Sequence, residues 1–158
     1  MRTMRAFVAA LTCVAAAASA SAAAGDAAYE VTILAIRATK SNSEVSPELR
    51  AIVPELKKQY ENYTGFKIVG KASKSTDQGK TVSLDVTGGY QASATPLKRD
   101  GKRVQFKMQV TKAARGKGKD QTLLNTTVTI DAGRYQLFDI GRVEGDGADK
   151  LIIAGSVR

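Results

Sequence analysis

The sequence contains no histidine and no tryptophan, and its only cysteine is Cys13. Without histidine there can be no Ser-His-Asp triad, no imidazole general base and no histidine-ligated zinc. Cys13 lies in a segment that we expect to be removed, so a thiolate nucleophile and a cysteine-rich metal site are excluded as well. We therefore predict no catalytic residue, no metal site and no bound cofactor.

The first 24 residues have the pattern of a secretory signal peptide. Arg2 and Arg5 form a short positive region, and residues 6–18 form the apolar run that follows it. Small residues at 18–24 provide suitable cleavage sites. We place cleavage after Ala24 and expect the remaining chain to be exported, to the periplasm or beyond.

Two alternatives for this leader are disfavoured. An apolar run of about 13 residues is too short for a membrane anchor, which needs about 20, so we expect no transmembrane span. The residues before Cys13 do not match a lipoprotein attachment motif. Cleavage leaves one β-rich domain, 25–158, and removes two arginines, which lowers the formal net charge from +9 to +7.

One helix is expected after the first strand. Ser46 can cap its amino end, and Pro47 suits the first helical position, where the missing N–H costs nothing. Pro54 removes one intrahelical bond and predicts a kink or a short break. An apolar stripe at helical spacing predicts that this helix packs on the core and is not a membrane binder: Leu49, Ile52, Val53, Leu56 and Tyr60.

Period-two alternation predicts β-strands along the rest of the chain. In residues 104–110, for example, Val104, Phe106 and Met108 alternate with Gln105 and Lys107. The expected strands are 29–38, 66–73, 80–86, 90–97, 102–112, 121–130, 135–140 and 150–157.

The connections have turn-forming sequences. Asp100-Gly101 and Ala132-Gly133 both predict tight hairpin turns. Short strands joined mostly by hairpins are typical of antiparallel sandwiches and barrels. We predict a mainly β (α+β) fold, an antiparallel β-sandwich or partly open barrel of about eight strands with one amphipathic, Pro-kinked helix.

Basic residues gather in two places. One group flanks the turn at 98–103, and the other fills a loop in which glycines alternate with cations, formed by Lys112, Arg115, Lys117 and Lys119. The two groups should lie at opposite ends of one strand, about 30 Å apart. The loop is the candidate anion site, since cations and exposed backbone N–H groups bind phosphate, carboxylate or sulfate. A solvated hairpin end is the alternative.

Other functional classes have little support. The acidic run 144–149 lacks the downstream glutamate of a calcium loop and suits a hairpin turn. Few aromatic residues are available to stack on bases, so we expect no nucleic acid partner. Enzyme chemistry would require a carboxylate pair or a Ser-Lys dyad, and no spacing in the sequence indicates either.

The order of elements resembles a group of small exported bacterial proteins of unknown function. The resemblance implies a β-rich envelope module with no assigned chemistry, and it transfers no catalytic residue. The ending is also similar to the last strands of secretin-type secretion domains, although paired glycines are replaced by Asp139-Ile-Gly141. The resemblance is based on the segments 36–39, 60–63, 67–69, 123–130, 132–133 and 151–155.

These observations predict a non-enzymatic exported envelope module for protein–protein interaction or assembly. Its partner would be an envelope protein, because hairpin-linked strands offer edges for strand addition. The alternative is a binder of an anionic ligand, a polysaccharide or a lipid headgroup, through the basic loop 112–119.

Overall fold

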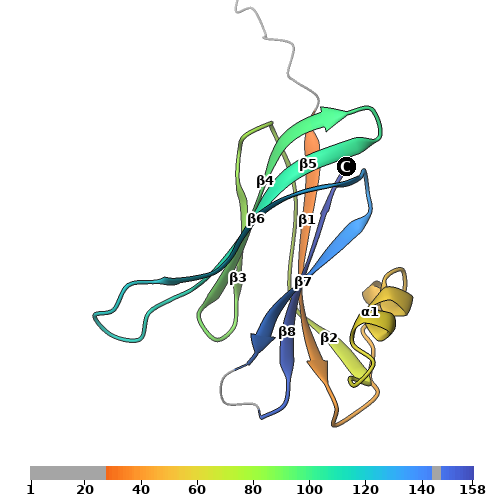
Figure 1. Cartoon of the computed structure of the whole chain (residues 1–158), viewed down its shortest axis with the longest axis vertical. Helices are drawn as coiled ribbons and strands as arrows, with labels where there is room; N and C mark the ends of the chain where they lie inside the picture. Colours follow the sequence, from red (N-terminus) through yellow and green to blue (C-terminus); the bar gives the residue numbers. More distant parts are fainter. Residues whose placement is uncertain (1–27, 144–146) are drawn as a thin grey trace, which may run out of the picture.

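In the computed structural model, which describes residues 28–143 and 147–158, eight strands form two four-stranded antiparallel sheets. Sheet A has the order β2-β1-β8-β7 and sheet B the order β3-β4-β5-β6. The predicted mainly β fold is confirmed, and the sheets pack as an open sandwich without closing into a barrel (Figure 1). The strands are β1 (Tyr29–Thr39), β2 (Gly65–Thr76), β3 (Val82–Val86), β4 (Tyr90–Asp100), β5 (Arg103–Lys112), β6 (Gln121–Asp131), β7 (Tyr135–Arg142) and β8 (Lys150–Val157).

The main core lies between the two sheets and follows the predicted alternation. Alternate side chains of β5 point to this interior and are fully buried: Val104, Phe106, Met108 and Val110. Gly155 on β8 faces the same region, where an added Cβ would lie 2.5 Å from Met108 Cε. A glycine is needed here because the large side chains of β5 fill the space above it.

A second cluster covers the other face of sheet A. Leu34 and Ile36 of β1 point away from the sandwich interior and pack with Leu49 and Leu56 of the segment between β1 and β2. Strands β1 and β8 are therefore buried on both faces, and the molecule has three layers (Figure 1). This double burial explains why residues 33–36 of β1 and 151–154 of β8 are continuously apolar.

The predicted helix is two short pieces. A 3₁₀ turn, Pro47–Leu49, is followed by α1, Val53–Gln59, so the expected break is confirmed. Pro54 lies in the first turn of α1, where a missing N–H is tolerated and a new helix can begin. Among the residues described, no helix is both long and apolar enough to cross a membrane.

The predicted capping role of Ser46 is wrong. Its side chain makes no cap hydrogen bond, and its hydroxyl instead accepts one from the Ile68 backbone N–H at 3.0 Å. The hydroxyl therefore ties the helical segment to β2. Nearby, the Phe66 N–H donates to the Glu44 carbonyl at 2.8 Å, so the start of β2 has a neighbour on its outer side.

Contacts around Lys150 hold the other end of the helical segment. Lys150 Nζ lies 2.6 Å from Asp139 Oδ2 and 5.5 Å from the centre of the Tyr60 ring. The Tyr63 hydroxyl donates to the Ala148 carbonyl at 3.2 Å. Burial, with a smaller contribution from the Asp139 charge, raises the pKa of Tyr60 to about 12. The segment is thus attached to sheet A at both of its ends.

One of the two predicted hairpin turns is confirmed. Asp100-Gly101 joins the paired strands β4 and β5. The prediction for Ala132-Gly133 is wrong, because this turn carries the chain from β6 in sheet B to β7 in sheet A. The physical reason lies in β7, where Leu137 and Phe138 are buried in different clusters. Only sheet A is covered on both faces, so β7 must join it.

We expect Leu56→Ala to lower the free energy of unfolding by about 2–5 kcal/mol, because Leu56 is fully buried beneath the helical segment. Urea unfolding at neutral pH measures the change. Exposed Lys57 on the same helix provides the control, and Lys57→Ala should change stability by less than about 0.5 kcal/mol. Equal effects of the two substitutions would contradict the packing described.

Candidate functional site

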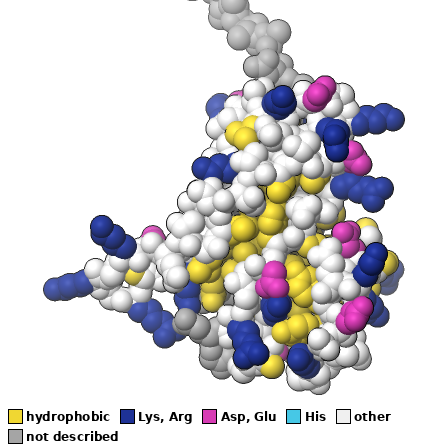
Figure 2. All heavy atoms as spheres, viewed as in Figure 1, with side chains coloured by type: hydrophobic (Ala, Val, Ile, Leu, Met, Phe, Trp, Pro, Cys, Tyr) yellow, Lys and Arg dark blue, Asp and Glu magenta, His cyan; other side chains and the backbone are white. Residues whose placement is uncertain are grey.

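The four cations of the predicted anion site lie at the end of the β5–β6 hairpin. Lys112 is the last residue of β5, while Arg115, Lys117 and Lys119 lie in the connection to β6. Figure 1 shows this hairpin extending beyond the body of the sandwich. Figure 2 shows Lys and Arg side chains around its end. The structure therefore brings the four predicted residues into one hairpin end.

Backbone and carboxylate contacts shape this hairpin end. The Ala113 N–H donates to the Gly89 carbonyl at 2.7 Å, which links the hairpin to the β3–β4 turn. The Ala114 N–H donates to Asp120 Oδ1 at 3.1 Å. The Ala114 N–H, which could have bound an anion, is therefore already occupied, and the carboxylate of Asp120 lies close to the cations.

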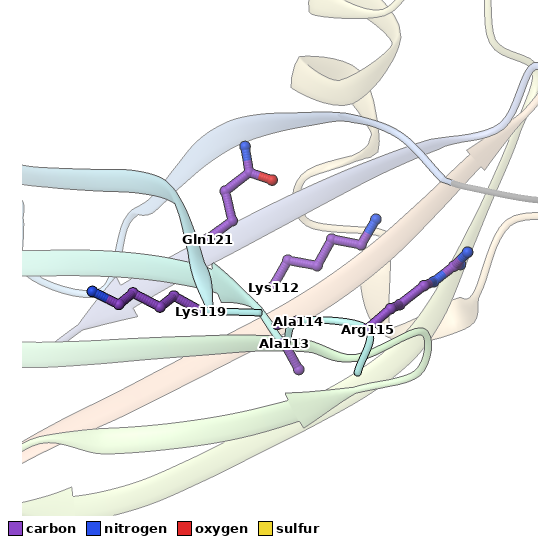
Figure 3. Close-up of a pocket in the computed structure, with 6 residues that line it drawn as sticks. All are labelled: Lys112, Ala113, Ala114, Arg115, Lys119 and Gln121. Carbon is purple, nitrogen blue, oxygen red and sulfur yellow. The ribbon is translucent and has the colours of Figure 1, made fainter. Parts of the chain in front are cut away.

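Three of the four cations line a shallow depression of about 180 Å³ without converging on it, namely Lys112, Arg115 and Lys119. Arg115 and Lys119 point in opposite directions (Figure 3). Lys112 Nζ lies 5.1 Å from the centre of the Tyr90 ring. A built anion site directs several donors at one point. This hairpin end instead provides a diffuse positive field.

The second basic group is at the far end of β5, as predicted. Lys98 and Arg99 end β4, and Arg103 begins β5 opposite Asp100. The Arg99 guanidinium lies 5.1 Å from the centre of the Tyr29 ring. The two groups are separated by the length of β5 and form no single patch.

The predicted acidic turn is only partly described, because residues 144–146 lie outside the described residues. Asp149 accepts a hydrogen bond from Arg37 Nε at 2.6 Å. Among residues 28–143 and 147–158, no three or more Asp, Glu, His or Cys side chains are grouped so as to hold a metal ion.

Asp149 also borders a polar depression of about 290 Å³ that includes Glu44. Burial would raise the pKa of Asp149, but hydrogen bonds from Thr39 and Arg37, with the Arg37 charge, outweigh burial and hold the pKa below its usual value. Asp149 is therefore ionised at neutral pH and is unsuited to donate a proton.

Strand β6 has a partly exposed row of core-facing side chains. The corresponding row of β5 is fully buried. On β6, Leu124, Thr126 and Val128 remain partly exposed, and only Ile130 is buried. Their exposure follows from position, because β6 is the last strand of sheet B and, within the part of the chain that the structure describes, pairs with β5 alone. The described residues cover the apolar surface at this edge only in part.

Across the opening, the edge strand of sheet A continues this apolar surface. Ile140 of β7 and Val143 just beyond it are partly buried and pack on the main core, as do Leu124 and Val128 of β6. Figure 2 shows hydrophobic side chains reaching the surface on this face, between the two sheets. The sandwich is thus open along the β6–β7 side.

The other edge strands have features that oppose pairing with a further strand. Strand β2 has Lys67, Lys71 and Lys74, and the segment at 44–46 lies beside its start. Strand β3 has only five residues. In β7 the register shifts between Asp139 and Gly141, a β-bulge that interrupts a flat edge.

In contrast, β6 offers a long and unprotected edge. Its residues from Gln121 to Ile130 include no charge and no proline. A register shift near Leu123 affects only its beginning, and pairing with β5 is regular from Leu124 to Asp131. The sequence analysis noted this strand but did not single it out. The absence of charge along ten residues of a basic chain was the available signal.

No protein-family model, curated protein or solved structure matches this chain. The resemblance to exported bacterial proteins therefore stays a prediction. Functional inference rests on the geometry of the described residues.

The Arg37–Asp149 pair predicts a pH-dependent contribution to stability. The folded-state pKa of Asp149 is lowered, so its contribution is present above the unfolded-state pKa, near 4, and is lost as the pH falls through the folded value. Asp149→Asn should cost about 1 kcal/mol at pH 7, and this difference should shrink below about pH 3. Urea unfolding at both pH values measures it.

The exposed ion pair of Asp77 with Lys80 supplies the control. Asp77→Asn should change stability by less than about 0.5 kcal/mol at either pH. A cost of Asp149→Asn that stays unchanged from pH 7 to well below about pH 3 would contradict the electrostatic account.

Proposed function

We propose that this protein is a non-enzymatic exported module that binds another protein, or joins an envelope assembly, by taking up an extended segment along β6. The observation that carries the proposal is the long, uncharged edge of β6 beside a partly exposed apolar row. Export rests on the leader pattern of residues 1–24.

Strand addition suits this edge in two ways. An added strand supplies partners for the backbone N–H and C=O groups on the outer side of β6. Its alternate side chains also cover Leu124 and Val128, and each Å² of apolar surface removed from water contributes about 25 cal/mol. Backbone hydrogen bonds give affinity that does not depend on the sequence of the added segment. The apolar row of β6 favours segments with apolar residues at every second position.

The basic hairpin supports a secondary role. Its cations diverge around a shallow depression, which favours long-range attraction over tight binding of one anion. Binding of a polysaccharide or lipid headgroup through Lys112, Arg115, Lys117 and Lys119 is the alternative function. Sensitivity to salt distinguishes it, because diffuse charge contacts are screened and buried apolar contacts are not.

A neutral peptide of about ten residues, with valine alternating with threonine or glutamine, should bind the protein. Val128→Lys should weaken binding at least about tenfold, because it puts a charge into the apolar row. Thr129→Lys is the matched control, since Thr129 is exposed on the opposite face, and it should change binding less than about twofold. Fluorescence anisotropy measures each affinity, and thermal unfolding checks that both variants fold.

Two further results test the mode of binding. A peptide N-methylated at every residue should not bind, because neither of its edges can donate hydrogen bonds to β6. Binding that ignores Val128→Lys but is lost in high salt and in the variant with Lys117→Ala and Lys119→Ala would contradict strand addition and favour the anionic-ligand alternative.

A further inference from the structure

Charges near β6 define what a neighbouring strand would meet. Before the strand begins, the hairpin end carries Arg115, Lys117 and Lys119. Asp131, the final residue, carries the only charge of β6, and Arg103 lies opposite it on β5. The β6 edge is therefore positive at its start, neutral along its length and has a carboxylate at its end.

These features specify the strand that would pair best along the edge of β6. It needs apolar side chains at alternate positions, no charge along its length, and an acidic residue at the end that lies beside the basic hairpin. Every strand pair in both sheets is antiparallel, and antiparallel pairs are slightly more stable. In an antiparallel pair, the end next to the basic hairpin is the neighbour's carboxyl end.

Strand β6 itself meets each requirement. It has an apolar row, no charge before its end, and Asp131 at the carboxyl end. We propose that the segment taken up by β6 is the β6 strand of a second copy of this chain, paired antiparallel about a two-fold axis. This proposal rests on the proposed function and names the partner.

The side-chain alternation is compatible with this symmetry. A two-fold axis at Thr126 places Leu124 opposite Val128 of the second copy, and both belong to the core-facing row. Residues directly opposite in an antiparallel pair share a face, so the two apolar rows join. The two copies of sheet B would become one continuous sheet, an isologous arrangement typical of dimers.

The same axis brings opposite charges together at both ends of the pair. Asp131 of one copy comes to the start of β6 in the other, beside a hairpin end in which four cations outnumber the single carboxylate of Asp120. The register shift near Leu123 lies between the axis and this end, so the attraction is to the net positive charge of the hairpin and not to one paired residue. Symmetry produces this attraction twice. The formal net charge of the chain opposes association, but screening over about 8 Å at physiological salt limits that repulsion.

Sedimentation equilibrium from micromolar to near-millimolar concentration tests the proposal, and we expect a reversible dimer. Asp131→Lys and Lys119→Asp should each raise the dimer dissociation constant about fivefold or more, and the double variant should dimerise more tightly than Asp131→Lys alone. Val128→Lys should abolish the dimer. Asp85→Lys on exposed β3 controls for the change of net charge and should have little effect.

A protein that is monomeric at every concentration overturns self-pairing. If that monomer still binds the alternating peptide at β6, the proposed function stands and the partner is another protein. If it also fails to bind the peptide, both proposals fall. A dimer that is unchanged by Val128→Lys and shows no charge-swap rescue uses another surface, which also overturns the β6 pairing.

Discussion

Among the described residues, the last strand of sheet B has a hydrogen-bonding partner on one side only, and the proposed function depends on this constraint. Strand β6 must still contribute its apolar row to the core, because β5 beside it is fully buried. The row is consequently half covered by the protein's own sheets and half open. An open sandwich cannot remove such an edge as a closed barrel can. It can only protect the edge with charge, bulges or short strands, and β6 has little of this protection.

The two sheets have different tasks. Sheet A is buried on both faces, since the helical segment covers its outer side and is fastened there through Ser46 and Lys150. Sheet B has one buried face and one solvated face, and it ends in the hairpin that carries the cations. The half of the molecule that contains both hydrophobic clusters thus supports the half that presents the β6 edge and the positive field. Such a division suits a binding module, whose contact surface needs a firm base.

Much of the fold was predictable from local patterns, and much of the candidate site was not. Alternation in several strands, and runs of β-branched and apolar residues in the others, predicted all eight strands, because the sequence of a strand reflects which of its faces are buried. The Ala132-Gly133 turn was misassigned, because a turn sequence does not determine which sheet the following strand joins. Ser46 was misassigned for a similar reason, as its hydroxyl accepts a hydrogen bond from Ile68, a residue distant in the sequence.

The basic loop was recognised from composition, but the divergence of Arg115 and Lys119 depends on three-dimensional side-chain directions. The edge position of β6 likewise depends on the path of β7.

The pairing of β1 with β8 has a consequence for how the chain folds. These strands are neighbours at the centre of sheet A, although Val31 pairs with Val157 and nearly the whole described chain separates them. Sheet A therefore cannot be completed until β8 has been synthesised, and non-local pairings of this kind are slow to form. A polypeptide passing through a translocation channel from its amino end would lack its central strand pair throughout the passage. The topology itself thus delays completion of the fold, which is compatible with the export that the leader pattern of residues 1–24 predicts.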